Sequence, residues 1–231
     1  NKTFKKTALS LTDKEVWIPL SAGLDSRLVL CGLLEHGVKN IKTFTYGLKG
    51  NFEAVAEKKI AKRLGIDWQF IPISHSEMAK YYKSTKYEKY IEDHETLSSV
   101  PVVHELLALE KLKSSGVFND KSVLINGQSG DFISGGHIGS VFFDHADDQL
   151  NVFLKHSFDK HFSLWKDLRN HGREELISSE INVFLKKSNL FHSSKKDRCS
   201  LYEWFEWKSR QSVYVINNQR VYDYHSLDWR L

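Results

Sequence analysis

The sequence contains little cysteine, proline or methionine: two, three and one residue among 231. Cys31 and Cys199 are too few for a disulfide framework or a metal cluster, which is typical of proteins in a reducing compartment. Cys31 falls inside a predicted helix, where we expect a packed thiol. No apolar run is long enough to span a bilayer, and the start of the chain lacks the apolar core of a secretion signal. These absences favour a globular, cytoplasmic protein with no membrane partner.

A strong excess of one charge is also missing. The formal net charge is +4, and the lysines are spread along the chain in short pairs such as Lys58-Lys59 and Lys195-Lys196. Without a basic stripe, nucleic acid is not favoured as a partner. The 11 histidines show no spacing typical of a helical zinc site, so we expect solvated or hydrogen-bonded imidazoles.

The most informative segment that is present is SAGLDS, residues 21–26. It follows the apolar run 16–20 and precedes apolar residues three and four apart in 27–34, a pattern that predicts a strand, a loop and a helix. Gly23 tolerates backbone angles that other residues avoid. Backbone N–H groups of this loop can therefore curl around an anion at the positive end of the helix.

The side chains of this loop suit a phosphate group. The Ser21 and Ser26 hydroxyls are donors, and Asp25 is an acceptor for a divalent cation that arrives with the phosphates. The pattern GxxxxGK[ST] of the common nucleotide loop does not occur in the chain. The segment is therefore either a different phosphate loop or a plain turn that opens an ordinary α/β helix.

The first half of the sequence alternates between strand-like and helix-like segments, which predicts an α/β fold with a doubly wound parallel sheet. We expect strands at 16–20, 41–46, 68–73 and 122–125, and helices at 27–34, 52–64, 76–90 and 102–112. The helix at 52–64 is expected to bury one face, formed by Phe52, Val55, Ala56, Ile60 and Leu64.

Helical periodicity dominates from about residue 147 to 223. We therefore predict two domains, an α/β core at 1–145 and a C-terminal helical annex at 146–231. The aromatic segment 202–208 has helical spacing, and we expect it to bury one face against the sheet domain.

A second polar glycine loop, NGQSGD at 126–131, follows the strand predicted at 122–125. Ligands of open parallel sheets bind beyond the carboxyl ends of the strands, where both loops lie. We therefore expect Asp25 and Asp131 to face one polyphosphate. Two carboxylates placed there repel unless a cation lies between them, and Mg²⁺ on the phosphates supplies that cation. A helix cap or a turn is the alternative role for Asp131.

Residues 126–136, NGQSGDFISGG, look like [SG]-G-x-G-[SA]-D-x-x-x-G-G, the second signature of asparagine synthetases. SAGLDS resembles the pyrophosphate loop of the N-type ATP pyrophosphatases, or PP-loop proteins, to which those enzymes belong. Residues 43–47 with Glu53 resemble the second strand and adenine-side turn of the family. Arg210, Arg220 and Asp228 resemble the arginine-bearing region of its acceptor pocket, in a version associated with bacterial surface-polysaccharide loci.

The resemblance implies an adenine nucleotide alpha hydrolase-like fold and an ATP-dependent, AMP-forming carbon–nitrogen ligase. A substrate carboxylate would form an acyl-adenylate, which ammonia would convert into an amide. The cofactors would be ATP and Mg²⁺. The implied contacts are Pro19 and Tyr46 for adenine; Asn126 and Gly127 for ribose and α-phosphate; Ser21, Ala22, Gly23, Asp25 and Ser26 for pyrophosphate; Asp25 and Asp131 for Mg²⁺; and Arg210 and Arg220 for the acceptor. Asp25, Asp131 and Gln128 would be catalytic.

Four positions depart from the family pattern. Ala22 replaces the usual second glycine and narrows the loop, Ser129 replaces a glycine, and Phe132 replaces a common glutamate. Gln128 stands where asparagine synthetases have a glutamate, and a neutral amide cannot act as a base.

The family's N-terminal glutaminase domain is not in this sequence, so we expect an excised synthetase domain. Ammonia would come from solution or from a separate glutaminase domain or subunit. The other partner would be a small-molecule carboxylate, for example a uronic acid of a polysaccharide precursor. A homo-oligomer is compatible with these expectations.

Two other functions fit parts of the sequence. tRNA modification, by thiolation or lysidine formation, occurs in PP-loop proteins, but it needs an RNA-binding surface, and thiolation also needs a cysteine near the nucleotide. A nucleotide-binding module without turnover fits the neutral Gln128. Pyrophosphate release separates the ligase from the module, and tRNA gel shifts test the RNA function.

Overall fold

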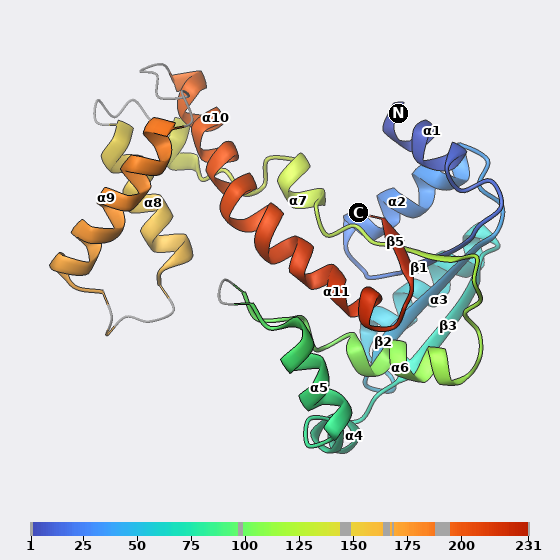
Figure 1. Cartoon of the computed structure of the whole chain (residues 1–231). Coiled ribbons are helices and arrows are strands. Elements are labelled where there is room, and N and C mark those ends of the chain that lie inside the picture. Colours follow the sequence, from blue (N-terminus) through green and yellow to red (C-terminus); the bar gives the residue numbers. More distant parts are fainter. Residues whose placement is uncertain are drawn as a thin grey trace. The chain divides into compact units, whose positions relative to one another are not determined.

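The computed structural model describes residues 2–96, 99–143, 149–163, 167, 169–187 and 195–230. The chain forms two compact units (Figure 1), the first with residues Asn1–Gly130 and Val213–Leu231 and the second with Asp131–Ser212. The sequence suggested one boundary, after residue 145. Contacts group the chain differently, because its last helix and strand belong to the unit that contains the sheet.

Five parallel strands form the sheet of the first unit, in the order β3-β2-β1-β4-β5. They are β1 (Glu15–Pro19), β2 (Ile41–Gly47), β3 (Asp67–Pro72), β4 (Ser122–Ile125) and β5 (Asp228–Arg230). The α/β class and the first four strands are as predicted, and Pro72 ends the edge strand β3. Three residues carry too little alternation to indicate a strand, which is why β5 was not predicted.

Seven described helices accompany this sheet. They are α1 (Lys2–Leu9), α2 (Leu24–Glu35), α3 (Phe52–Leu64), α4 (His75–Tyr81), α5 (Thr85–His94), α6 (Leu106–Ser114) and α11 (Ile216–Tyr224). The segment predicted as one helix at 76–90 is divided into α4 and α5. Ser84 causes the division, since its hydroxyl accepts a hydrogen bond from the N–H of Tyr87 and caps a new helix.

The sheet buries both faces, as a parallel sheet requires. Trp17, Phe44 and Leu124 point to one face and pack with apolar residues of α6. Val16 and Val123 point to the other face and pack with apolar residues of α2. Figure 1 shows α6 and α2 on opposite sides of the sheet. The short runs of apolar residues in the strands follow from this two-sided burial.

The predicted buried face of α3 is wrong for most of its members, although Ile60 packs against the core. Phe52 and Val55 are 77% and 50% exposed, whereas Ala54, Glu57 and Ala61 are buried. The helix is rotated from the expected orientation because a hydroxyl on β2 provides a polar partner for the Glu57 carboxyl, as described below. Hydrophobic spacing alone could not indicate that a glutamate faces the sheet.

The expectation of a packed Cys31 thiol is also wrong, since Cys31 is exposed on α2. The buried residues of α2 are Ser26, Leu30, Gly32 and Leu33. Gly32 allows α1 to approach, because a Cβ at this position would lie 2.7 Å from the Phe4 ring. Close packing of α1 thus turns Cys31 outward.

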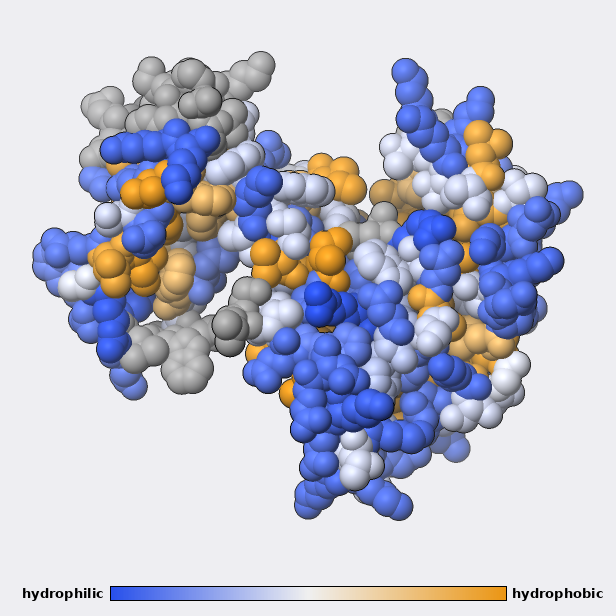
Figure 2. All heavy atoms as spheres, in the orientation of Figure 1, coloured by the Kyte–Doolittle hydropathy of each residue, from blue (hydrophilic) through white to orange (hydrophobic). Residues whose placement is uncertain are grey.

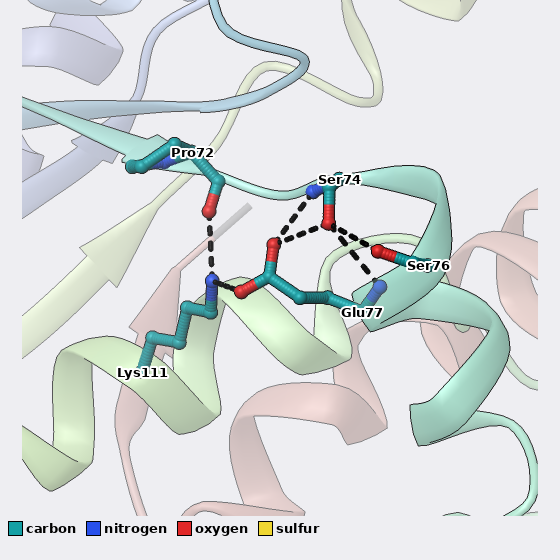
Figure 3. Close-up of polar contacts among 5 residues, drawn as sticks. All are labelled: Pro72, Ser74, Ser76, Glu77 and Lys111. Atoms are coloured by element: carbon teal, nitrogen blue, oxygen red, sulfur yellow. Dashed lines mark hydrogen bonds and ion pairs between the residues drawn. The ribbon is translucent and has the colours of Figure 1, made fainter.

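A polar cluster fixes the start of α4 (Figure 3). Ser74 and Glu77 form a reciprocal cap, in which the Ser74 hydroxyl accepts from the Glu77 N–H and the Glu77 carboxylate accepts from the Ser74 N–H. Lys111 of α6 contacts both the Glu77 carboxylate and the Pro72 carbonyl at 2.7 Å. Over α4 and α5 the surface is largely hydrophilic (Figure 2), as the polar sequence predicts.

The second unit is helical among its described residues, as the periodicity predicted. It contains α7 (Gly130–Ile133, which starts at the boundary), a 3₁₀ turn at Ser140–Phe143, α8 (Gln149–His161), α9 (His171–Lys187) and α10 (Lys195–Glu206), followed by a π-helical segment at Trp207–Val215. Its own core includes Phe142, Phe153, Tyr202 and Phe205. The aromatic segment 202–208 therefore packs inside this unit.

Candidate functional site

The carboxyl ends of β1 and β4 lie side by side, because the two strands are parallel neighbours with Val16 opposite Val123. A cavity of about 340 Å³ opens at this edge, within the first unit. Eight residues predicted from the sequence line it: Pro19, Ser21, Asp25, Ser26, Tyr46, Asn126, Gly127 and Gln128. The two glycine loops thus meet at the edge where parallel sheets bind ligands.

A larger cavity, of about 640 Å³, lies near the amino ends of β1 and β2. Lys5, Lys14 and Lys39 are among the residues that line it, together with aliphatic side chains of α1. None of the predicted site residues lies there. Since ligands of open parallel sheets bind at the carboxyl ends, the smaller cavity is the candidate site.

The loop after β1 is held by its own hydroxyl groups. The Ser21 N–H donates to the Ser26 hydroxyl, and the Ser26 hydroxyl donates to the Ser21 carbonyl, each over 3.1 Å. The Gly23 N–H donates to the Ser21 hydroxyl over 3.3 Å. Both hydroxyls that the sequence suggested as phosphate donors therefore fix the shape of the loop.

Arg27 was not predicted and completes this loop. Its guanidinium donates to the carbonyl groups of Gly23 and Ala22, at 2.9 and 3.2 Å. A cation bound to two loop carbonyls offsets their partial negative charge, which favours an anion at the same loop.

Gly23 does not use the conformational freedom that the sequence suggested. Its φ is −69° and its ψ is 166°, which any residue can adopt. Space is the constraint instead, because a Cβ at Gly23 would lie 3.2 Å from the Ser21 hydroxyl oxygen.

The glycines of the second loop allow it to contact Asp25. A Cβ at Gly127 would lie 2.8 Å from the Asp25 carbonyl carbon, and one at Gly130 would lie 2.3 Å from the Asp25 carboxyl carbon. Only residues without side chains permit this approach. Asp25 lies in the first turn of α2, where the helix dipole stabilises a carboxylate.

A buried hydroxyl group on β2 anchors the start of the loop after β1. The Thr45 hydroxyl on β2 contacts the Leu20 carbonyl at 3.1 Å and also the carboxyl group of Glu57. The Trp68 indole N–H donates to the same hydroxyl over 3.1 Å. Burial raises the pKa of Glu57. The sequence gives no sign of this anchor, because its members lie on four separate segments.

Thr45 carries one proton but faces two oxygens that accept hydrogen bonds. If Thr45 donates to the Leu20 carbonyl, Glu57 has to carry a proton and donate it to Thr45. The raised pKa of Glu57 agrees with this neutral form. The carbonyl that precedes Ser21 is then fixed by a neutral chain of hydrogen bonds.

The far wall of the cavity combines aromatic and acidic groups that were not predicted. Tyr46 stacks on His104, with ring centroids 6.3 Å apart. Burial raises the pKa of Tyr46 and lowers the pKa of His104, so both rings are kept neutral. Burial also raises the pKa of Glu105 to about 7.

Two residues from a distant part of the chain contact this wall and the second loop. Gln219 and Tyr222 lie on α11, and both contact the Asn126 amide group, at 2.7 and 3.1 Å. Tyr222 donates to Glu105 over 3.1 Å, and Gln219 donates to Gln128 over 2.6 Å. A separation of about 90 residues or more hides this cluster from short-motif reasoning.

Some predicted residues lie outside the cavity. Ala22 and Gly23 belong to the loop but do not line the cavity. Asp131 follows Gly130 and begins the second unit, which also contains Arg210, whereas Arg220 is exposed on α11 of the first unit. The roles of Asp131, Arg210 and Arg220 therefore stay predictions.

The donor set fits a magnesium ion that is held largely by phosphate oxygens. Among the described residues, no group of three or more histidine, cysteine, aspartate or glutamate side chains could hold a metal ion. Mg²⁺ commonly binds through one or two carboxylates together with substrate phosphates and water. Asp25 lines the cavity and supplies one such carboxylate.

One of the comparisons with known proteins finds a match for this chain. A family model described as asparagine synthase matches residues 6–231, nearly the whole chain. A search of curated proteins found no match. In the described part of the chain, no helix is both long and apolar enough to cross a membrane.

Proposed function

The chain belongs to the asparagine synthase family, and we propose that it activates a carboxylate with ATP and transfers it to ammonia, with release of pyrophosphate and AMP. Family membership supports ATP-dependent amide ligase activity in general. One observation carries the finer proposal: Asp25 of the first loop is in close contact with the second loop, at Gly127 and Gly130, beside one cavity.

In this proposal each part of ATP has a place along the two loops. Backbone groups near Pro19 and Tyr46 contact adenine, and Asn126 and Gly127 lie beside the ribose and α-phosphate. The loop of residues 21–26 binds the β- and γ-phosphates with its N–H groups at the amino end of α2. Asp25 and Asp131 would hold Mg²⁺, which neutralises phosphate charge when it is bound.

The proposed reaction has two displacements. A carboxylate oxygen attacks the α-phosphorus, the bond from this phosphorus to the bridging oxygen breaks, and pyrophosphate leaves. Ammonia then attacks the acyl carbon, the bond from this carbon to the phosphate oxygen breaks, and AMP leaves with that oxygen and the electron pair. The nitrogen loses a proton to water. Both displacements depend on positioning and charge neutralisation more than on covalent help from the protein.

The acceptor is proposed to be a small carboxylate, with Arg210 and Arg220 as candidate contacts through bidentate bonds. Uronic acids of polysaccharide precursors belong in the test because the expected subgroup is associated with surface-polysaccharide loci. Ammonia is proposed to come from solution or from a glutaminase partner.

The test incubates the purified chain with Mg²⁺, ATP, ammonium and either aspartate or glucuronate, and measures pyrophosphate, AMP, phosphate and ADP. We expect pyrophosphate and AMP in equal amounts, dependent on the carboxylate. Asp25→Asn should lower this release while the circular dichroism spectrum stays unchanged. Asp67→Asn on β3, the same change at an exposed position away from the cavity, is the matched control.

Other products distinguish the alternatives. Release of ADP and phosphate contradicts the proposal. Tight ATP binding without pyrophosphate release for any carboxylate favours a nucleotide-binding module, and a tRNA gel shift at physiological salt favours tRNA modification.

A further inference from the structure

The Gln128 side chain is exposed at the cavity, yet its amide oxygen is held by a hydrogen bond. The Gln219 amide nitrogen donates to Gln128 Oε1 over 2.6 Å. Gln219 itself is 0% exposed. The orientation of the Gln128 amide therefore depends on how the buried Gln219 is oriented.

A backbone carbonyl fixes the orientation of Gln219. Gln219 Nε2 lies 3.1 Å from the Val215 carbonyl oxygen, which can only accept a hydrogen bond. Rotating the amide by 180° would place two acceptor oxygens against each other. Gln219 Nε2 therefore donates one proton to Val215 and the other to Gln128.

A backbone N–H fixes the neighbouring amide of Asn126 in the same way. The Gln128 N–H donates to Asn126 Oδ1 over 3.2 Å, so the other terminal atom of Asn126 is the nitrogen. This nitrogen donates to Gln219 Oε1 and to the Tyr222 hydroxyl. The two buried amides thus use all four of their N–H protons, and neither can rotate without losing bonds.

The fixed amides of Gln219 and Asn126 allow only one orientation of the Gln128 amide group. Because its oxygen accepts from Gln219, the opposite terminal atom is the NH₂ group. We propose that Gln128 presents this NH₂ group to the cavity and binds an anionic oxygen of the ligand, with Gln219 and Asn126 as positioning residues. The identity of that ligand, a carboxylate or a phosphate, rests on the function proposed above.

The chemistry of an amide NH₂ group decides between two ligands of the reaction. It can only donate, so it stabilises an oxygen that bears or develops negative charge. Ammonia needs an acceptor to orient its N–H bonds, and Gln128 offers none on this side. Glutamine stands here in place of the glutamate of asparagine synthetases. The preferred partner of this side chain therefore changes from the amine to an oxyanion.

The first test needs no ligand. Hydrogen exchange of side-chain amides, followed by NMR of ¹⁵N-labelled protein, should show protected NH₂ groups for Asn126 and Gln219 and fast exchange for Gln128. A protected Gln128 NH₂ group together with a fast Gln219 NH₂ group would overturn the proposed orientation, whatever the protein binds.

The second test uses Gln128→Glu, which keeps an oxygen for Gln219 and replaces the donor with an acceptor. Affinities for AMP and adenosine are measured by calorimetry, and the KM for aspartate or glucuronate by pyrophosphate release. If the partner is the α-phosphate, AMP should bind about tenfold or more weakly while adenosine is unchanged. If it is the carboxylate, the AMP affinity stays constant and the KM rises by a similar factor.

The matched control for this variant is Gln69→Glu on β3, which adds the same charge at an exposed position away from the cavity. Equal AMP affinity and equal KM in Gln128→Glu and the wild type would overturn the inference. A wild-type protein that binds AMP but releases no pyrophosphate contradicts the proposed function instead, and the exchange and AMP measurements still test the orientation of Gln128.

Discussion

Two buried glutamates, one in each unit, have pKa values that are shifted in opposite directions from the ordinary value. Glu105 is 5% exposed; burial raises its pKa to about 7, and one bond from Tyr222 offsets this only in part. Glu206 is 0% exposed, and burial also raises its pKa, but bonds from His161, Tyr202 and Lys160 lower it to about 2. The comparison teaches that partners, and above all cations, decide the charge of a buried carboxyl.

The two carboxyl groups serve their units differently. Glu206 joins α8 and α10, because Lys160 and His161 lie on α8 and contact it at 2.9 and 2.8 Å. Glu105 lines the candidate site and ends a chain of hydrogen bonds at Asn126. The charged Glu206 fixes helices of the second unit. Glu105, whose pKa is about 7, borders the cavity of the first unit.

The largest effect is expected when Glu206 is removed. Glu206→Ala leaves the buried Tyr202 hydroxyl without its partner and Lys160 and His161 without a counter-charge, which should cost about 4 kcal/mol of unfolding free energy. Urea unfolding at pH 7 measures this loss. Glu206→Gln keeps the shape and one acceptor, so its loss should be smaller. Equal stability of the alanine variant and the wild type would show that Glu206 is not the anchor of these helices.

Glu206 and Glu105 also predict opposite pH dependence. The lowered pKa of Glu206 contributes stability above its ordinary pKa of 4.5, and this contribution is lost as the pH falls towards 2. The raised pKa of Glu105 contributes stability that is complete below 4.5 and is lost as the pH rises through about 7.

The second prediction concerns Glu105→Gln, which mimics the neutral carboxyl at every pH. Its stability relative to the wild type should rise by about 3 kcal/mol between pH 4.5 and pH 8, the free energy that corresponds to the change in pKa. Unfolding curves at several pH values measure it. A constant difference across this range would mean that Glu105 titrates normally and that the contrast with Glu206 is absent.

The third prediction extends the comparison to Glu57, another buried glutamate, which contacts the hydroxyl of Thr45. Thr45→Val keeps the shape but removes the hydroxyl between Glu57, Leu20 and Trp68, at a cost of about 2 kcal/mol in stability. ATP should also bind more weakly, because the Leu20 carbonyl precedes the loop that is proposed to bind the phosphates. Thr45→Ser keeps the hydroxyl and is the control. A valine variant with wild-type stability and ATP affinity would exclude the anchor.

These differences explain which parts of the site could be predicted. Asp25, Gly127 and Gly130 lie in short patterns at strand ends, where local spacing indicates both the turn and its place on the sheet. Glu57 and Glu105 could not be found in this way, because a buried carboxyl in a sequence looks like a solvated one. Only the neighbours that the fold supplies, from β2 or α11, show its role.

The same reason explains the errors in packing. Phe52 and Val55 match a helical apolar face, yet Glu57 takes the buried position because Thr45 lies opposite it. Spacing predicts that a helix has a buried face, but the partner surface selects which face it is. The strands β1, β2 and β4 were predicted well because their apolar runs need no choice of face when both sides are buried.

The smallest effect is expected from an exposed carboxyl with the same low pKa as Glu206. Hydrogen bonds from Lys111 and Ser74 lower the pKa of Glu77 to about 2. Water and salt screen this pair, so Lys111→Met should leave the melting temperature nearly unchanged, and 1 M salt should leave even less of a difference. A large loss of stability in Lys111→Met would show that surface pairs hold this fold as buried ones do. A small loss of stability in Lys111→Met would show that burial is the reason why the Glu206 cluster stabilises its helices, because the pKa values of Glu77 and Glu206 are alike.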